Sequence, residues 1–396
     1  MKLFNRKIKS MIALILALLA LMPNMALAQE ATKRGPLALS IDAPSAIIME
    51  ASSGEVIFEQ NGSERRAPAS VTKVMTMLLV YEALDQNRIA LGDIVTTSEN
   101  AAGMGGSQVY LEVGEKQTVE DLLKAVVIAS GNDAAVALAE FISGSEESFV
   151  DLMNKKAEQL GMKDTSFKNP CGLDAQGHFS TAHDIALMSR ELINKYPQVK
   201  DVATIWMDTI IHKTARGEEE FGLTNTNKMV KWYDGTTGLK TGSTGEALYC
   251  LSATATRGDM ELITVVLGAD NSSIRFQESM KMMDYGFANY KVVKGELVGT
   301  VVGEVAVKKG KTPTAQAVVA ELVSNVTEKG NNTEITSEIT LYDDIKAPLA
   351  AGDVVGEIIY TYEGEEIGRS PLLAEEAVER ASFVEMTKRT FDTWFK

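Results

Sequence analysis

The segment from Val71 to Leu84 is apolar on almost every side of the helix that it would form. A helix without a polar face has to lie inside a larger protein, covered on all sides by other elements. Pro68 suits the first turn of such a helix, and Ser70 and Lys73 share one face of that turn. The chain is therefore expected to fold around an interior helix whose first turn holds a hydroxyl and an amine.

This Ser-x-x-Lys pattern has two interpretations. Ser70 can cap the helix while Lys73 extends its amine to water. Alternatively, the pair is a nucleophile and its base, kept in register by the rigid helix. The pattern is short enough to occur by chance, so other residues have to decide between the two.

The N-terminus has the organisation of a secretory signal peptide. An apolar run, 11–22, follows a basic stretch and precedes Ala26-Leu27-Ala28. The run has about 12 residues, whereas a bilayer span needs roughly 20. We predict a signal peptide over 1–28 and a mature protein that works outside the cytoplasm.

Composition excludes several classes of function. With 396 residues, 45% of them apolar and 23% charged, the chain has room for two globular domains. A formal charge of −15 makes nucleic acid an unsuitable partner, because binding phosphates requires clustered Lys and Arg. Cys171 and Cys250 permit one disulfide in an exported protein but no disulfide framework. No His-Glu-x-x-His or Cys-x-x-Cys pattern occurs, so neither a metal site nor a cofactor is expected.

Strand patterns stand at both ends of a long helical region. Residues 46–50 and 55–59 flank a turn and form an early β-hairpin. Later, 248–255 and 260–268 form a second hairpin around Arg257-Gly-Asp259, which we interpret as a turn and not as an adhesion motif. We expect the strands from both ends of this region to pair in one sheet, with the helices between them in the sequence.

The C-terminal part has a different composition and a different spacing of apolar residues. From about Lys291, short segments rich in Val and Thr predict a separate small all-β domain, with strands near 298–307, 334–341 and 354–362. The tail, 382–396, has aromatic residues on one helical face and charges on the other. We favour a helix in the membrane interface over a helix docked on its own domain, because few residues remain to cover its aromatic face.

Two further short motifs follow the Ser-x-x-Lys pair. At Ser130-Gly-Asn132 the apolar pattern breaks; Gly131 is expected to end one helix and Asn132 to cap the next. Lys240-Thr-Gly242 lies on or beside a strand, where Gly lets a ligand approach the backbone and Lys with Thr suits a carboxylate.

In this order, Ser-x-x-Lys, Ser-x-Asn and Lys-Thr-Gly form the motif set of the penicillin-recognising serine enzymes. The chain resembles the low-molecular-mass penicillin-binding proteins that act as D-alanyl-D-alanine carboxypeptidases. The resemblance extends to Asn169-Pro-Cys-Gly-Leu-Asp174, Ser180-Thr-Ala-His-Asp184, Asn225-Thr-Asn-Lys228 and Gly238-Leu-Lys-Thr-Gly-Ser-Thr-Gly-Glu246. In the Asn-Pro-x-Gly-Leu segment, Cys171 stands where relatives often have another residue.

The resemblance implies an α/β (α+β) fold, with an antiparallel sheet flanked by helices and an active site between the sheet and a helical part. It implies a serine β-lactamase/transpeptidase-like catalytic domain over 36–288, the all-β domain over 291–373 and an anchor helix over 374–396. The enzyme would lie at the outer face of the cytoplasmic membrane, attached peripherally.

The resemblance also implies roles for individual residues. Ser70 would attack the carbonyl of the penultimate D-alanine of a peptidoglycan stem peptide, and Lys73, made neutral, would accept its proton. To be half neutral near pH 7, Lys73 would need a pKa about 3 units below its ordinary value; burial, the helix macrodipole and a nearby Lys240 would all act in that direction. Ser130 would pass a proton to the departing amine.

Substrate binding would fall to Asn132, Lys240, Thr241, Gly242 and Ser243. Asn132 would hold the peptide amide, and Lys240 and Thr241 the free carboxylate. Backbone N–H groups of Ser70 and Ser243 would receive the oxyanion. β-Lactams would acylate Ser70.

Other classes remain open at this stage. A class A β-lactamase needs Glu-x-x-Leu-Asn, and Glu191-Leu-Ile-Asn194 is one residue too short. A transpeptidase would use an amine acceptor in place of water, and a wall-binding protein would be silent towards penicillin. A Ser-His-Asp hydrolase is disfavoured because the chain has no Gly-x-Ser-x-Gly and three histidines.

Overall fold

The computed structural model describes residues 39–214 and 217–387. The predicted signal peptide and the end of the predicted anchor lie outside these ranges. A five-stranded antiparallel sheet has the order β2-β1-β9-β8-β7. Its strands are β1 (Ser45–Glu50), β2 (Val56–Gln60), β7 (Thr236–Thr244), β8 (Leu248–Arg257) and β9 (Met260–Ala269). The two ends of the predicted catalytic region thus pair in one sheet, as expected.

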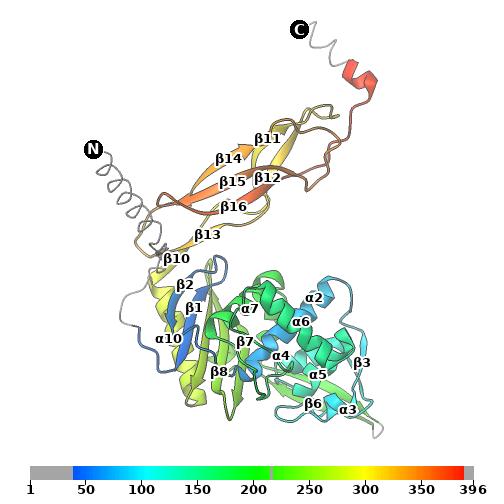
Figure 1. Cartoon of the computed structure of the whole chain (residues 1–396), viewed down its shortest axis with the longest axis vertical. Helices are drawn as coiled ribbons and strands as arrows, with labels where there is room; N and C mark the ends of the chain where they lie inside the picture. The colour runs from blue at the N-terminus through cyan, green and yellow to red at the C-terminus, as the bar shows by residue number, and fades with distance from the viewer. Residues whose placement is uncertain (1–38, 215–216, 388–396) are drawn as a thin grey trace, which may run out of the picture. The chain divides into compact units, whose positions relative to one another are not determined.

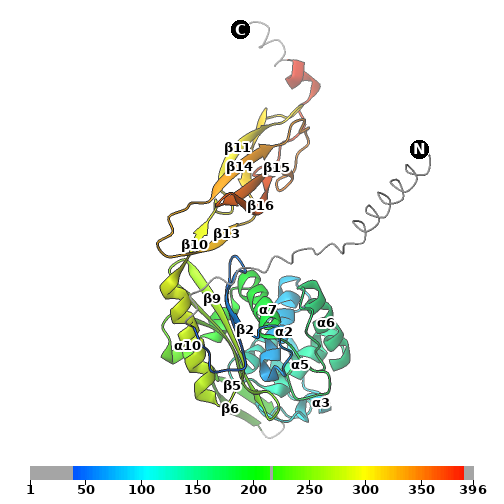
Figure 2. The same ribbon diagram turned by 60° about the vertical axis from the view of Figure 1, so that its left-hand side comes forward.

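Both faces of the main sheet are covered. Every residue of β1 is buried, and alternate residues enter different cores, as a strand between two layers requires. Ile47 and Met49 pack towards the helical part, whereas Ala46 and Ile48 pack in the core beside α10 (Ser272–Asn289). Figures 1 and 2 show α10 along one side of the sheet.

The helical part surrounds α2 (Lys73–Asp85), which is buried at every residue except Glu82, Leu84 and Asp85. The interior helix predicted from the apolar run is therefore confirmed. The helices that pack against it are α4 (Val119–Val127), α5 (Asn132–Ser143), α6 (Glu146–Gln159) and α7 (Ala182–Lys195). Three short helices, α3 (Glu99–Ala102), α8 (Val199–Ala203) and α9 (Met229–Trp232), also lie between β2 and β7 in the chain.

Two antiparallel strand pairs interrupt the predicted helical region. In one, β3 (Ile94–Thr96) pairs with β4 (Lys116–Thr118); in the other, β5 (Met207–Thr214) pairs with β6 (Gly217–Thr224). Most side chains of β5 and β6 are not buried, so these strands lack the apolar alternation that would have predicted them.

The C-terminal domain is all-β, as predicted. One sheet has the order β11-β12-β16-β15-β14, and β10 pairs with β13. The strands are β10 (Tyr290–Lys294), β11 (Val301–Ala306), β12 (Thr314–Val319), β13 (Ser324–Glu328), β14 (Thr336–Leu341), β15 (Val354–Tyr362) and β16 (Glu365–Ala374). Val355, Ile358 and Leu372 lie at the centre of its core.

The predicted anchor region starts with extended backbone. Isolated bridges join Val378 to Leu349 and Arg380 to Gly310, and helical backbone is described over 383–387. There Phe383 is 80% exposed and Val384 is 75% exposed. None of the described helices has both the length and the apolar character needed to cross a membrane.

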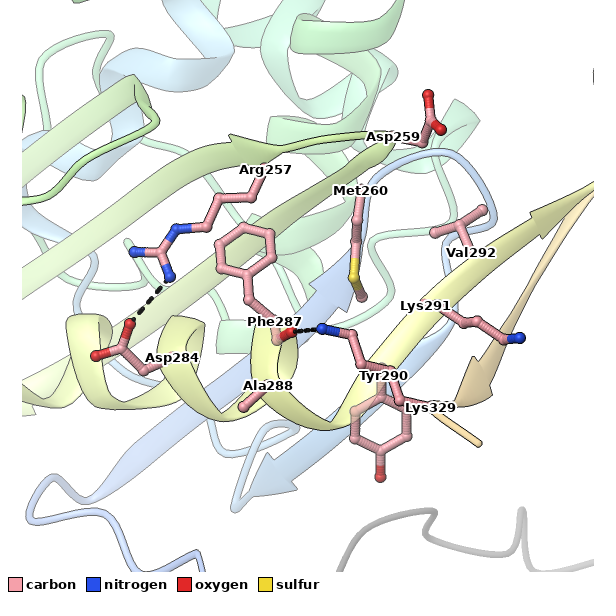
Figure 3. Close-up of a pocket in the computed structure, with 10 residues that line it drawn as sticks. All are labelled: Arg257, Asp259, Met260, Asp284, Phe287, Ala288, Tyr290, Lys291, Val292 and Lys329. Atoms are coloured by element: carbon pink, nitrogen blue, oxygen red, sulfur yellow. Dashed lines mark hydrogen bonds and ion pairs between the residues drawn. The ribbon is translucent and has the colours of Figure 1, made fainter. Parts of the chain in front are cut away.

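A cavity of about 580 Å³ lies where α10 ends and β10 begins (Figure 3). Lys329 Nζ donates to the carbonyl of Phe287 at 2.6 Å, and Arg257 pairs with Asp284 at 3.4 Å. None of the residues around this cavity belongs to the predicted active site.

Candidate active site

Ser70 lies in a 3-10 turn, η1 (Ala69–Thr72), that leads directly into α2. His178 fixes this turn: its Nε2 lies 2.9 Å from Thr72 Oγ1, and its Nδ1 accepts from the backbone N–H of Lys168 at 3.1 Å. Nδ1 is therefore the acceptor, so Nε2 carries the proton and donates to Thr72. Burial lowers the pKa of His178 to about 4, which keeps the ring neutral. This histidine orients the turn without acting in the chemistry.

Lys73 is completely buried beside the serine. Its Nζ donates to Ser70 Oγ at 2.9 Å, to Asn132 Oδ1 at 2.6 Å and to the Cys171 carbonyl at 2.7 Å. Burial lowers the pKa of Lys73 from 10.5 to about 8, against the opposing field of the Asp133 carboxylate. The amine is thus close to losing its proton near neutral pH.

The geometry around Lys73 suits both protonation states. As an ammonium it uses three N–H groups on three acceptors. As a neutral amine it keeps two N–H groups for Asn132 and Cys171, and its lone pair then faces Ser70 Oγ. The same hydrogen bonds therefore hold the amine in place to accept a proton from the serine.

Ser130 and Asn132 lie at the start of α5. Ser130 is 4% exposed and has a left-handed φ of 65°, while Gly131 occupies the cap position. The prediction that Asn132 caps this helix is wrong: its Oδ1 accepts from Lys73, and its Nδ2 donates to the Gly105 carbonyl at 2.6 Å. Its amide therefore braces the Lys73 amine.

Sequence reasoning singled out the segment containing Cys171 but missed that its backbone contributes to the site. Asn169 Oδ1 accepts from the backbone N–H groups of Cys171, Gly172 and Leu173. Gly172 has a φ of 84°, and a Cβ there would lie 1.9 Å from the carbonyl oxygen of Ala69. The segment thus packs directly on the nucleophile turn, and Cys171 contributes a backbone carbonyl to the site.

Both cysteine thiols are free and buried. Burial raises the pKa of the Cys171 thiol above its ordinary value and that of the Cys250 thiol to about 11. Neither thiol therefore has the thiolate character of a reactive cysteine.

The Lys-Thr-Gly motif lies on β7, an edge strand of the main sheet. Lys240 is completely buried, and burial together with the charges of Lys73 and Arg275 lowers its pKa well below 10.5. Thr241 Oγ1 donates to Thr226 Oγ1 at 2.7 Å. A Cβ on Gly242 would lie 2.9 Å from the backbone N of Ser70, so the strand packs tightly on the nucleophile turn.

Arg275 of α10 holds this strand from the opposite side. Its Nη1 donates to the carbonyls of Gly242 at 2.9 Å and Cys250 at 3.2 Å, and its guanidinium lies over the ring of Tyr249. Burial lowers the pKa of Arg275 to about 10, so it stays charged. The sequence offered no motif that singled out this arginine.

The structure brings the three predicted motifs to one place. Direct hydrogen bonds join Ser70, Lys73 and Asn132, and packing places Gly242 against Ser70. Electrostatic repulsion from Lys73 reaches Lys240. Ser130, two residues before Asn132, is buried. Ser243, directly after Gly242, is exposed. The arrangement offers a hydroxyl and an amine at the start of α2, together with a second lysine on the edge strand β7.

Comparisons with known proteins agree with this arrangement. The sequence model for D-alanyl-D-alanine carboxypeptidase matches residues 29–271, and that for the C-terminal domain of penicillin-binding protein 5 matches residues 290–380. D-alanyl-D-alanine carboxypeptidase DacF of Bacillus subtilis is 43% identical over 392 residues, which cover 99% of both chains.

Solved structures are similar as well. Penicillin-binding protein 5 from Haemophilus influenzae superposes with a TM-score of 0.69 at 33% identity, covering 87% of this chain and 100% of that one. A mutant of the Streptomyces K15 DD-transpeptidase gives a TM-score of 0.59 at 31% identity and covers 63% of this chain and 99% of its own.

Proposed function

The chain belongs to the D-alanyl-D-alanine carboxypeptidase family, and from this premise we propose that it removes the terminal D-alanine from peptidoglycan stem pentapeptides through an acyl-enzyme on Ser70. It is a serine-type carboxypeptidase. The observation that supports this mechanism best is the buried Lys73 amine, 2.9 Å from Ser70 Oγ with a pKa of about 8.

Acylation begins when Ser70 Oγ attacks the carbonyl of the penultimate D-alanine and its proton passes to Lys73. The oxyanion is received by the backbone N–H groups of Ser70 and Ser243. Ser130 then delivers its proton to the departing amine and receives the proton that Lys73 took from Ser70, which returns Lys73 to its neutral form. Asn132 holds the peptide amide while it braces Lys73. Water hydrolyses the acyl-enzyme, and β-lactams acylate the same serine.

The terminal carboxylate binds at Lys240 and Thr241. An arriving carboxylate favours the protonated form of Lys240, whose pKa is otherwise lowered by burial and by Lys73. A cation at Lys240 in turn favours the neutral form of Lys73. Binding of the correct end group therefore prepares the base, which explains a preference for peptides that end in a free carboxylate.

The proposal is tested by measuring D-alanine release from a peptide ending in D-Ala-D-Ala across pH. Because the mechanism needs a neutral Lys73 and a protonated Lys240, kcat/KM should rise with pH through about 8 and fall again at higher pH, where Lys240 loses its proton. At pH 7 about one tenth of the free enzyme would hold the neutral amine, given this pKa. A rate that falls between pH 6 and 8, or no release of D-alanine, would contradict the mechanism.

Gly242→Ala should slow acylation by labelled benzylpenicillin by about 100-fold, the usual effect of a lost oxyanion donor. The added Cβ would lie 2.9 Å from the backbone N atoms of Ser70 and Val71, which cannot move away. Gly245→Ala is the matched control, because nothing lies within 4 Å of the position of its Cβ. Equal rates in the two variants would show that Gly242 does not shape the oxyanion site.

The same proposal places the enzyme at the outer face of the cytoplasmic membrane, attached by its C-terminal helix. The exposed Phe383 and Val384 support this, because apolar side chains at a chain end suit a lipid interface. Removing 383–396 should move the protein from the membrane fraction to the soluble fraction. If the shortened protein still sediments with membranes, the attachment lies elsewhere.

A further inference from the structure

Asp133 is a buried carboxylate that the proposed mechanism does not use. It follows Asn132 in the first turn of α5 and is 1% exposed. In the part of the chain that the structure describes, all of its hydrogen bonds come from backbone N–H groups, and no Lys, Arg or His forms an ion pair with it. Burying a charge without a cation in contact is costly, so the position of this carboxylate calls for an explanation.

The carboxylate of Asp133 holds a loop against the start of α5. Its oxygens accept from the backbone N–H of Val109 at 3.2 and 3.1 Å and from that of Leu111 at 3.1 Å. The backbone N–H of Ala134 donates to Oδ1 at 2.9 Å. Val109 and Leu111 are themselves buried. This bracing loop, residues 105–111, is therefore tied to the helix at one end.

The other end of the bracing loop holds Asn132. The Gly105 carbonyl accepts from Asn132 Nδ2 at 2.6 Å, and the Ser107 carbonyl accepts from the backbone N–H of Asn132 at 2.7 Å. Because Nδ2 faces the loop, Oδ1 faces Lys73 and accepts from its Nζ at 2.6 Å. The orientation of the Asn132 amide towards the amine thus depends on the loop that Asp133 holds.

The negative charge of Asp133 also acts on the Lys73 amine. Burial lowers the pKa of Lys73 to about 8, and Asp133 acts in the opposite direction. The Cys171 thiol adds no charge near neutral pH, because burial raises its pKa and keeps it protonated. Lys240 of β7 and Lys73 repel each other when both are charged. Among these described groups, Asp133 is therefore the one that carries a negative charge near neutral pH.

Other charged groups on the helices around α2 have partners elsewhere. Lys156 of α6 pairs with Glu82 at 2.7 Å, nine residues and roughly 13 Å along α2 from the amine. Lys124 of α4 pairs with Asp208 at 3.3 Å, and Arg190 of α7 donates to carbonyls of the turn after β1. None of them is a source of the pKa change at the amine.

We propose that Asp133 is a positioning residue for the reaction: through the bracing loop it fixes the Asn132 amide on Lys73, and its negative charge acts on the Lys73 amine. Both effects reach the reacting atoms through Lys73. The inference rests on the proposed function, because it takes Lys73 as the base. A residue that served only the fold of α5 would not influence the pH at which the enzyme becomes active.

The test measures kcat/KM for D-alanine release from a peptide ending in D-Ala-D-Ala across pH in Asp133→Asn. Removing the negative charge favours the neutral amine, so the rising limb should move to lower pH by about 0.5 to 1 unit. Asn also turns an NH₂ group towards backbone N–H groups and so loosens the bracing loop, and the maximum should fall about tenfold. The ratio of variant to wild type should therefore be about three to ten times larger on the rising limb than at the maximum.

Hydrogen exchange checks the positioning part of the inference. The amides of Val109 and Leu111 should exchange faster in Asp133→Asn, because they lose a carboxylate acceptor. Asp133→Glu keeps the charge but moves the carboxylate by one methylene group. Its rising limb should stay at the wild-type pH while its maximum falls, which tests the inference even if Asp133→Asn does not fold. Titration of Ser70 with benzylpenicillin counts the folded enzyme in each preparation.

Glu50→Gln is the matched control. Glu50, on β1, is also 1% exposed, and its carboxylate also accepts from backbone N–H groups, those of Ser52 and Ser53. This variant should lose stability and keep the wild-type pH profile.

A rising limb that stays in place in Asp133→Asn, or that moves equally in Glu50→Gln or Asp133→Glu, would overturn the inference and leave the proposed function intact. An unchanged maximum in both Asp133 variants would also overturn it. No release of D-alanine by the wild-type enzyme would contradict the proposed function and the inference with it.

Discussion

Ser70→Ala should lower kcat/KM for D-alanine release by at least about 10⁴-fold, because removal of the nucleophile from a serine enzyme leaves little besides binding and oxyanion stabilisation. The substitution removes one hydroxyl from a partly buried position and leaves α2 intact. Thermal unfolding should therefore change little. Measuring D-alanine release and the unfolding midpoint on the same preparation separates loss of chemistry from loss of fold.

Mass spectrometry after exposure to benzylpenicillin checks the same assignment independently. The wild-type chain should gain one penicilloyl group on the peptide that contains Ser70, and Ser70→Ala should gain none. Ser63→Ala, at an exposed serine a few residues earlier, is the control and should be labelled normally. An adduct on any other residue would refute the role of Ser70.

Lys73→Met should lower the acylation rate by about 10³-fold, within the range expected for loss of a general base. Methionine fills a similar volume but offers no amine, so Ser70 keeps its proton. The change also leaves Asn132 Oδ1 and the Cys171 carbonyl without their donor. Removing a buried cation offsets part of that cost, since burying a charge is itself unfavourable. Stopped-flow acylation by a chromogenic cephalosporin measures the effect.

Lys156→Met is the control for Lys73. Lys156, on α6, pairs with Glu82 of α2 at 2.7 Å, so its loss affects the same helix without touching the site. It should reduce stability modestly and leave the acylation rate unchanged. Similar rate losses in both variants would mean that Lys73 supports the helix and is not the base.

The fold was predictable wherever hydrophobic pattern determines structure. Apolar spacing predicted the interior position of α2, the hairpins at the two ends of the catalytic domain and the all-β domain after Lys291. The hairpin β5–β6 was missed because its residues are mostly exposed and polar, with Glu218, Glu219 and Glu220 in succession. Pairing with the neighbouring strand stabilises such an element, and its own sequence contains little of the pattern from which strands are predicted.

The site was predictable in its side chains but not in its backbone. Ser70, Lys73 and Asn132 could be selected by residue type and spacing, and the structure brings them together. The backbone carbonyl of Cys171 could not be selected in this way, because every residue has a backbone carbonyl. The lowered pKa of Lys73 was expected, and burial is its main cause; Lys73 and Lys240 repel each other when both are charged.

The pairing of β1 with β9 has a consequence for biogenesis. Ser45 lies opposite Leu267, more than two hundred residues later in the chain, so β1 has no neighbour on that side until β9 has been synthesised. Contacts of such long sequence separation form slowly. A nascent polypeptide that stops before Met260 would contain every motif of the site yet could not assemble it. We therefore expect the ability to hydrolyse substrate to appear in a single late step, after β9 has been synthesised.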